Sequence, residues 1–229
     1  MKELNKFKCV IVSGGLLEDE AYHRQIIKEA KMVICADSGA RHVLRLGITP
    51  SLVVGDLDSL AAEEIKELKK RGVKFVQYPR EKDYADTYYA LLKALEFGYE
   101  GIAMVACLGG RFDHALSNIM LLALPQVRAL DVRILEPCQE IFLIKPKMKL
   151  WGQKGEILSL LPLSEEVTGI TTSGLYYQVP AGRFTMGLPL GVSNVFTDEV
   201  VELSLEKGLL LGIHIKKEKS GDFRFLFSS

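Results

Sequence analysis

The chain has few cysteines, no excess of charge of one sign and no long hydrophobic run. Its four cysteines form no C-x-x-C pair, which argues against a disulfide-stapled scaffold or a zinc site. Lys plus Arg and Asp plus Glu both number 29, so the net charge is zero, which disfavours nucleic acid and membranes as partners. The longest stretch without Asp, Glu, Lys or Arg, residues 167–182, carries several Thr and Ser side chains and is too polar to span a membrane.

A secretion signal and several common catalytic motifs are also missing. Gly14 and Gly15 interrupt the first apolar stretch and no small-residue cleavage site follows, so we expect a cytoplasmic location. The sequence contains no G-x-x-x-x-G-K-[ST], G-x-G-x-x-G, G-x-S-x-G or H-E-x-x-H motif. This disfavours P-loop ATPases, dinucleotide dehydrogenases, hydrolases with a nucleophile elbow and zinc proteases of the H-E-x-x-H type.

The composition divides the chain into two parts. Of its 15 alanines, 14 lie at or before Ala129, and alanine favours helices over strands. In this first part, short apolar runs alternate with amphipathic stretches, which predicts a mostly parallel sheet covered by helices. The expected strands are 9–12, 32–36, 52–54, 73–78, 102–106 and 132–135, and the expected helices are 19–31, 40–46, 61–71, 84–97 and 113–124. Ser59 is the expected N-cap of the third helix.

From about residue 139 onward, the pattern changes to a period of two. Apolar residues alternate with polar ones over 201–206 and 209–216, and Phe223, Phe225 and Phe227 repeat the same period. This is typical of antiparallel strands with one buried face, in a small sandwich or barrel. The sequence therefore predicts an α/β domain over residues 1–138 and an all-β sandwich domain over 139–229.

Acidic and glycine residues follow successive predicted strands of the first domain. Ligands of open α/β sheets bind at the carboxyl ends of the strands, so we expect these residues to lie close together. They comprise six aspartates with one Lys, one Arg and a glycine pair: Asp37, Asp56, Asp58, Lys82, Asp83, Asp86, Gly109, Gly110, Arg111 and Asp113. If the turn is extended, Asp56 and Asp58 face one cation, and carboxylate oxygens suit Mg²⁺. The glycine pair and Arg111 suit phosphate oxygens.

Structural roles compete with these functional ones. Asp56, Asp58 and Asp83 are all suited to capping a following helix. Gly109 and Gly110 are equally consistent with a plain turn, and His114 alone is more typical of a structural hydrogen bond. However, so many like charges at one sheet edge repel one another unless a cation neutralises them. The cluster as a whole therefore predicts a metal-assisted reaction on phosphates.

The ordered motifs ICADSGA, LGITPSLVVGDLDS, KDYADTYYAL, LGGRFDHALSNIMLL, TTSGLYY and GVSN resemble those of the thiamine pyrophosphokinase family. The resemblance implies an α/β catalytic domain followed by a β-sandwich domain, in a homodimer with thiamine near the subunit interface. It implies transfer of a pyrophosphoryl group from ATP to the hydroxyl of thiamine, which releases AMP.

The resemblance also assigns roles to residues. Asp56, Asp58 and Asp86 match its Mg²⁺ ligands, with Asp37 and Asp83 completing the acidic cluster. Arg111 and Asp113 match the positions that shape the nucleotide and thiamine site. Ser193 and Asn194 match a pair beside thiamine, and Tyr177 stands where the family often has Trp, which keeps an aromatic face. Ser38 and Ala85 depart from the family pattern, which has Gly and Thr there.

Two chemical roles and two alternative functions stay open at this point. Mg²⁺ with Arg111 or Lys82 is expected to neutralise the triphosphate, and Asp86 or Asp113 is the candidate base for the thiamine hydroxyl, although phosphoryl-type transfer needs no essential base. One alternative is a glycosyltransferase that holds a metal with Asp56 and Asp58. The other is a sensing module that binds nucleotide or thiamine without turnover.

Overall fold

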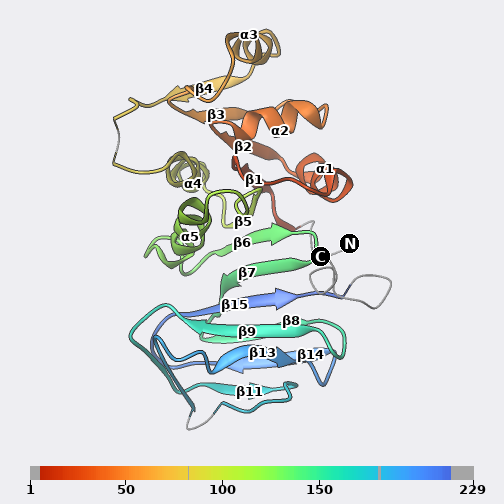
Figure 1. Cartoon of the computed structure of the whole chain (residues 1–229), viewed down its shortest axis with the longest axis vertical. Coiled ribbons are helices and arrows are strands. Elements are labelled where there is room, and N and C mark those ends of the chain that lie inside the picture. The colour runs from red at the N-terminus through yellow and green to blue at the C-terminus, as the bar shows by residue number, and fades with distance from the viewer. Residues whose placement is uncertain (1–5, 82, 180–181, 218–229) are drawn as a thin grey trace. The chain divides into compact units, whose positions relative to one another are not determined.

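A computed structural model describes residues 6–81, 83–179 and 182–217. It divides the chain into two compact units, Met1–Pro137 and Cys138–Ser229, which we call the N-terminal and C-terminal units (Figure 1). Lys82 and the stripe Phe223, Phe225 and Phe227 lie outside the described residues. Among the helices that are described, none combines the length and apolar character needed to cross a membrane.

The N-terminal unit contains a parallel sheet in the order β6-β5-β1-β2-β3-β4. Its strands are β1 (Cys9–Val12), β2 (Met32–Ala36), β3 (Leu52–Gly55), β4 (Lys74–Gln77), β5 (Gly101–Val105) and β6 (Asp131–Glu136). Its helices are α1 (Glu20–Glu29), α2 (Gly39–Arg45), α3 (Ala62–Lys70), α4 (Asp86–Glu96) and α5 (Phe112–Met120), followed by the 3₁₀ turn η2 (Leu121–Ala123). The predicted α/β architecture is confirmed.

Strand β1 lies at the centre of this sheet, and every one of its residues is buried. It pairs with β2 on one side and with β5 on the other, so the strand order reverses beside it. Helix α4 packs against β1, β2 and β3 through Ala90, Leu91 and Ala94. Such a reversal point opens a crevice at the carboxyl ends of the strands, where ligands of these folds bind.

The start of α3 differs from the prediction. Ser59 is not its N-cap, because the chain first makes a turn in which the N–H of Leu60 donates to Leu57 O at 3.3 Å. The cap residue is Ala61, whose N–H donates to the Glu64 carboxylate at 2.8 Å. The glutamate three residues into the helix therefore satisfies the backbone group that a serine was expected to satisfy.

The C-terminal unit is an antiparallel β-sandwich. One sheet has the order β13-β9-β15-β7 and the other β11-β14-β8, with β10 and β12 forming a separate pair. The strands are β7 (Gln139–Leu143), β8 (Lys147–Trp151), β9 (Ile157–Pro162), β10 (Glu166–Thr168), β11 (Thr171–Ser173), β12 (Arg183–Thr185), β13 (Gly191–Val195), β14 (Val200–Ser204) and β15 (Leu210–Ile215). Leu158 and Leu160 of the first sheet share a core with Val201 and Leu203 of the second. The predicted sandwich is confirmed.

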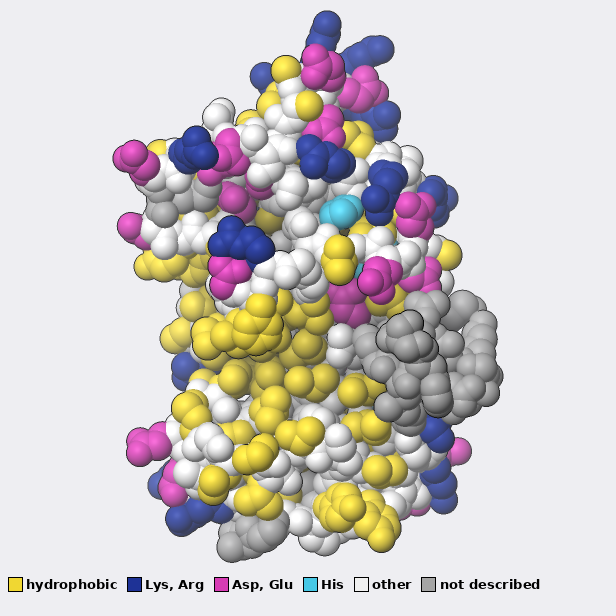
Figure 2. Space-filling view, in the orientation of Figure 1, with side chains coloured by type: hydrophobic (Ala, Val, Ile, Leu, Met, Phe, Trp, Pro, Cys, Tyr) yellow, Lys and Arg dark blue, Asp and Glu magenta, His cyan; other side chains and the backbone are white. Residues whose placement is uncertain are grey.

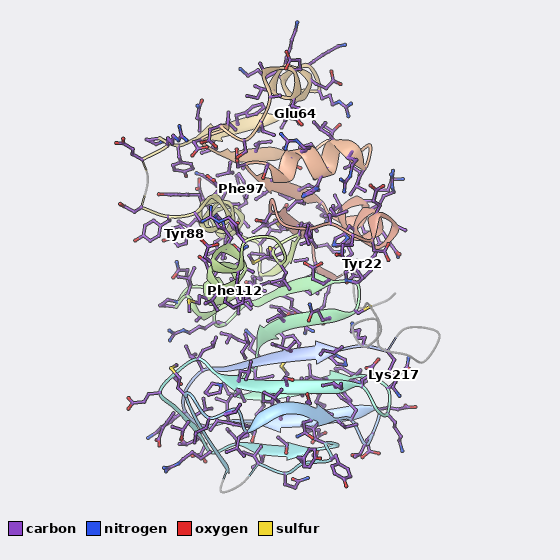
Figure 3. All side chains as sticks on the ribbon, viewed as in Figure 1. Tyr22, Glu64, Tyr88, Phe97, Phe112 and Lys217 are labelled. Atoms are coloured by element: carbon purple, nitrogen blue, oxygen red, sulfur yellow. The ribbon has the colours of Figure 1, made fainter. Side chains whose placement is uncertain are left out.

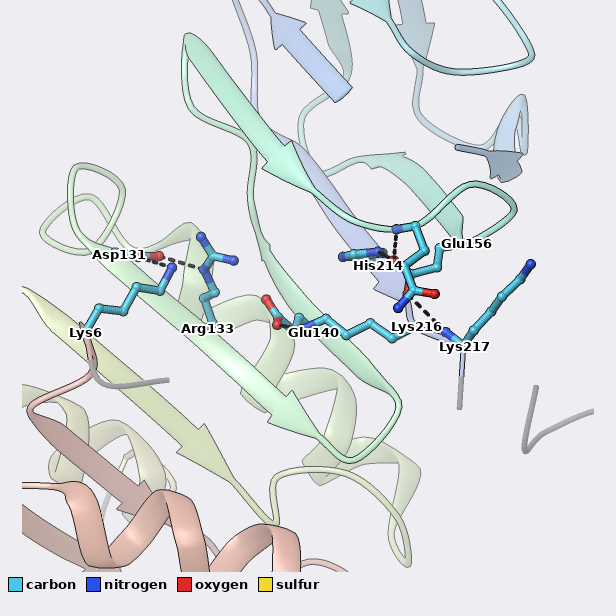
Figure 4. Close-up of polar contacts among 9 residues, drawn as sticks. Lys6, Asp131, Arg133, Glu140, Glu156, His214, Lys216 and Lys217 are labelled. Carbon is cyan, nitrogen blue, oxygen red and sulfur yellow. Dashed lines mark hydrogen bonds and ion pairs between the residues drawn. The ribbon is translucent and has the colours of Figure 1, made fainter. Parts of the chain in front are cut away.

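A buried glutamate directly before β9 pairs with a buried histidine of β15. His214 Nε2 lies 2.8 Å from Glu156 Oε2, and both residues are at most 4% exposed (Figure 4). The carboxylate also accepts the N–H groups of Gln153 at 3.0 Å and Lys217 at 3.2 Å. The His214 ring stacks on Phe196 with 4.8 Å between centroids. Burial alone raises the pKa of Glu156, but the hydrogen bonds from His214 and the backbone outweigh it and leave the pKa below its usual value.

We expect this pair to make the stability of the protein depend on pH. Because the pKa of Glu156 is lower in the folded protein, its stabilising effect is complete above the unfolded value, about 4.3, and is lost as the pH falls through the folded value. Glu156→Gln should lower the free energy of unfolding at neutral pH by about 1–3 kcal/mol and flatten its fall between about pH 6 and pH 3. Urea unfolding across this range measures both effects.

The exposed Glu165 provides a matched control for that experiment. Glu165→Gln should reproduce the pH dependence of the unchanged protein. Identical pH profiles for Glu156→Gln and the unchanged protein would contradict the expectation.

Candidate functional site

A cavity of about 440 Å³ opens at the carboxyl ends of the parallel strands in the N-terminal unit. Its lining comes from the segments that follow β1, β2, β3 and β5 and from the first turn of α4. The lining residues are Ser13, Gly14, Gly15, Leu16, Ala36, Asp37, Ser38, Asp58, Ser59, Ala85, Asp86, Thr87, Cys107, Gly109, Gly110, Arg111, His114 and Asn118. The cavity therefore lies at the point where the strand order reverses, between the ends of β1 and β5.

Three carboxylates gather at this edge. Asp37, Asp56 and Asp58 each offer one oxygen, and these oxygens all lie within 4.8 Å of one another. Asp37 is buried and, within the described residues, its Oδ1 has no hydrogen-bond partner, whereas Asp56 is half-buried and Asp58 is exposed. A buried carboxylate oxygen without a donor is costly unless a cation or water satisfies it. This set of hard oxygen ligands suits a divalent cation such as Mg²⁺.

Asp86 lies next to this group across Gly55. A Cβ atom at Gly55 would be 3.0 Å from Asp86 Oδ1 and 3.0 Å from the Cβ of Asp37, so only glycine fits between the two side chains. Asp86 opens α4, while Asp37 follows β2. The compact group of three thus includes Asp37 in addition to Asp56 and Asp58, with Asp86 beside it.

The chain turns sharply at several of these positions. Asp37, Leu57 and Ala106 have positive φ angles of 44°, 67° and 51°, a region that non-glycine residues seldom occupy. Leu57 separates Asp56 from Asp58, so the two acids are brought together by a tight turn and not by the extended turn that the sequence analysis assumed. The N–H of Asp58 donates to Asp56 Oδ1 at 3.1 Å and holds this turn. Strained backbone of this kind concentrates at functional sites.

Three buried polar residues of the cavity lining, Ser13, Thr87 and Asn118, were given no role in the site from the sequence. The Ser13 and Thr87 hydroxyls lie 2.9 Å apart and are buried, and Asn118 Nδ2 donates to Cys107 O at 2.9 Å. Burial raises the pKa of the Cys107 thiol well above its usual value, and the charge of Glu136 adds to this, so the thiol stays neutral. Ser13 directly precedes the pair Gly14 and Gly15 at the end of the first strand, and Thr87 directly follows Asp86, so their neighbours in the sequence are the signal that could have found them.

An arginine at the N-cap of α5 contacts an aspartate in the first turn of that helix. Gly109 and Gly110 have φ angles of 83° and 66°, and Arg111 Nη2 lies 2.5 Å from Asp113 Oδ2. The hydrogen bond from Arg111 lowers the pKa of Asp113 to about 2. Among the described residues, the cavity lining includes Arg111 but not Asp113. An ionised carboxylate committed to a guanidinium is a weak proton acceptor.

The segment before α4 contains one predicted site residue, Asp83, and one cation that was not predicted, Arg80. Asp83 is exposed and is not among the described residues that line the cavity. Arg80 Nε lies 3.2 Å from Asp58 Oδ2. The loop that leads to α4 therefore supplies a cation to the acidic group.

In the C-terminal unit the structure brings Tyr177, Ser193 and Asn194 together. The buried Asn194 side chain accepts the N–H groups of Tyr177 and Val195, both at 2.9 Å, and donates to Tyr177 O at 2.7 Å. Tyr177 is exposed and makes an edge-to-face contact with Tyr176, with 4.9 Å between centroids. Ser193 is exposed and has a φ of 59°.

Comparisons with known proteins agree with this arrangement. Residues 23–134 match the family model "Thiamin pyrophosphokinase, catalytic domain", and residues 143–210 match "Thiamin pyrophosphokinase, vitamin B1 binding domain". The chain is similar to thiamine pyrophosphokinase of Bacillus subtilis, with 30% identity over 93% of this chain and 98% of that protein. It is also similar to thiamine pyrophosphokinase 1 of Oryza sativa, with 25% identity over 82% of this chain and 80% of that protein.

A solved structure extends the likeness to the fold. The crystal structure of thiamine pyrophosphokinase from Bacillus subtilis superposes with a TM-score of 0.81 and 27% identity, and covers 92% of this chain and 99% of that one. Both family models match, in chain order, and the similarity extends over nearly the whole sequence. The chain therefore belongs to the thiamin pyrophosphokinase family.

Proposed function

We propose that this chain is an enzyme that transfers a pyrophosphoryl group from ATP to the hydroxyl of thiamine, which gives thiamine pyrophosphate and AMP. Membership of the family supports this function, and the group Asp37, Asp56 and Asp58 at the cavity is the observation that carries it. In the reaction, the thiamine oxygen attacks the β phosphorus, the bond from that phosphorus to the α,β-bridging oxygen breaks, and AMP leaves. The hydroxyl proton passes to a nearby carboxylate or to solvent.

We assign Mg²⁺ to Asp56, Asp58 and Asp86, with Asp37 as a further ligand. The buried Asp37 oxygen that lacks a donor within the described residues supports the assignment, since a cation satisfies it. When bound, Mg²⁺ neutralises charge on the triphosphate and orients it. The protein residues then have to place the thiamine hydroxyl in line with the β phosphorus, because positioning and electrostatics supply most of the catalysis in such transfers.

The remaining residues fall into three proposed roles. Gly109, Gly110, Arg111 and Lys82 bind phosphate oxygens of ATP, and Asp83 completes the acidic cluster of the ATP site. Tyr177, Ser193 and Asn194 recognise thiamine. Both candidate bases are engaged by a cation, Asp113 by Arg111 and Asp86 by the proposed metal, so the transfer relies on positioning and the hydroxyl proton can pass to solvent.

We also propose that the protein acts as a homodimer in the cytoplasm. Helix α5 supports the dimer, because Phe112, Leu116 and Met120 recur every four residues along one face and are exposed, Phe112 by 78% (Figure 3). Hydrophobic side chains gather in Figure 2 over the part of the N-terminal unit that Figure 1 labels α5. A contiguous exposed apolar face of this kind marks an interaction surface.

The central test of the function is the identity of its products. Incubation with Mg²⁺, ATP and thiamine should give one AMP for each thiamine pyrophosphate, which chromatography with mass detection measures. ADP in place of AMP would mean transfer of a single phosphoryl group and would overturn the proposal. A glycosyltransferase would instead release a nucleoside diphosphate from a sugar nucleotide, and a sensor would bind without products.

Removing a carboxylate from the acidic group should abolish turnover without unfolding the protein. We expect Asp56→Asn, Asp58→Asn and Asp86→Asn each to lower kcat about 100-fold or more, because several kcal/mol of transition-state stabilisation depend on the metal. Without metal, the melting temperature of each variant should equal or exceed that of the unchanged protein, since repulsion is relieved. In the unchanged protein Mg²⁺ should raise the melting temperature, and in the variants this shift should shrink.

Asp198, an exposed residue of the C-terminal unit paired with Lys154, provides the control for charge loss alone. Asp198→Asn should retain full turnover and the full Mg²⁺ shift. Near-normal turnover in all three site variants would remove these residues from the metal site.

The dimer has its own test. Sedimentation at micromolar concentration should give the mass of two chains, and Leu116→Glu with Met120→Glu should give one, because the substitutions bury charge in an apolar contact. Phe97→Glu changes an exposed apolar residue at the end of α4 and should leave the dimer intact. A monomeric unchanged protein would refute the dimer, and a dimer that survives both substitutions would refute only the role of α5.

A further inference from the structure

Strand β13 contains a bulge immediately before Asn194. Gly191 pairs with Leu160 of β9, and Asn194 pairs with Leu158, so two residues of β13 stand opposite the single residue Ser159. These two residues, Val192 and Ser193, are both exposed, although neighbours in a regular strand point to opposite faces. The extra residue thus interrupts the alternation of the strand at Ser193.

The bulge carries backbone strain. Ser193 has a φ of 59°, a conformation that costs a non-glycine residue free energy unless neighbouring contacts hold it. The contact that holds it comes from the opposite strand. The buried Ser159 hydroxyl accepts the N–H of Ser193 at 3.0 Å and takes the place of the ladder hydrogen bond that the bulge removes.

The same interruption turns Asn194 inward. Gly191 and Asn194 are three residues apart and both buried, although Val192 and Ser193 between them are exposed, a pattern that the bulge explains and regular alternation does not. From that position Asn194 makes its three hydrogen bonds to the backbone of Tyr177 and Val195. The bulge therefore sets the positions of Ser193 and, through Asn194, of the exposed Tyr177.

We propose that Ser159 is a positioning residue for thiamine recognition: its hydroxyl holds the bulge that presents Ser193 and Tyr177 to thiamine. This inference rests on the proposed function, which assigns thiamine binding to these two residues. Ser159 itself is buried and acts on thiamine only through the bulge. Loss of its hydroxyl should therefore weaken thiamine binding and leave ATP binding unchanged.

The experiment measures thiamine and ATP affinity by calorimetry together with both Michaelis constants. Ser159→Ala should raise the thiamine dissociation constant about five-fold, the value of one net hydrogen bond, while the ATP constants stay constant. Ser159→Thr keeps a hydroxyl and should restore most of the affinity. Ser164 is the matched control, because its hydroxyl also accepts a backbone N–H, that of Leu209 at 2.9 Å, away from the bulge. Ser164→Ala should lower stability without changing thiamine affinity.

A double-mutant cycle identifies the route of the effect. Ser193→Gly loses a hydroxyl but adopts positive φ without strain, so the bulge then needs no support from Ser159. Ser159→Ala should consequently change thiamine affinity by less than about two-fold in the Ser193→Gly background. An equal effect in both backgrounds, an unchanged thiamine constant in Ser159→Ala, or equal loss of thiamine and ATP affinity would overturn the inference.

Binding and turnover separate this inference from the function on which it rests. If the protein binds thiamine but forms no thiamine pyrophosphate, the proposed reaction is refuted. The double-mutant cycle of Ser159 and Ser193 can still be measured, because it needs only thiamine affinity. Normal turnover with an unaltered thiamine constant in Ser159→Ala would refute the role of Ser159 and leave the reaction intact.

Discussion

Mutual repulsion of carboxylates at one sheet edge is the constraint on which the site depends. A parallel sheet brings the carboxyl ends of all its strands to one side, so acids that are far apart in sequence meet there. Asp37, Asp56 and Asp58 accordingly place oxygens within 4.8 Å of one another, with Asp86 beside them. Like charges at this distance destabilise the fold unless a cation joins them, so a site built for metal is less stable without it.

The surroundings of that edge fit the same constraint. Gly55 lets Asp37 and Asp86 approach from two different elements, and Leu57 adopts a rare backbone conformation that folds Asp56 back toward Asp58. Arg80 and Arg111 place positive charge nearby, each already paired with an aspartate. Packing and backbone conformation therefore hold the acidic side chains close together, because electrostatic repulsion alone would push them apart.

Periodicity in the sequence predicted the fold because burial depends on local pattern. Strand Cys9–Val12 is buried throughout and Met32–Ala36 from Val33 onward, and both appear with the expected bounds because such short apolar runs suit the interior of a sheet. The start of α3 was missed because capping passed from Ser59 to Glu64 through a turn. The cluster of acids was expected from strand order, but the contact of Ser13 with Thr87 joins residues 74 positions apart and leaves no local signal.

The bulge in β13 depends on the exact number of residues in that strand. Deleting Val192 would leave a single residue of β13 opposite Ser159, so the pairs Gly191–Leu160 and Asn194–Leu158 could persist while the bulge at Ser193 is lost. A substitution on this edge strand changes one side chain, whereas the deletion would remove the backbone conformation that leaves both Val192 and Ser193 exposed. Relatives that share this surface should therefore tolerate a different residue type at position 192 far more readily than a different number of residues between Gly191 and Asn194.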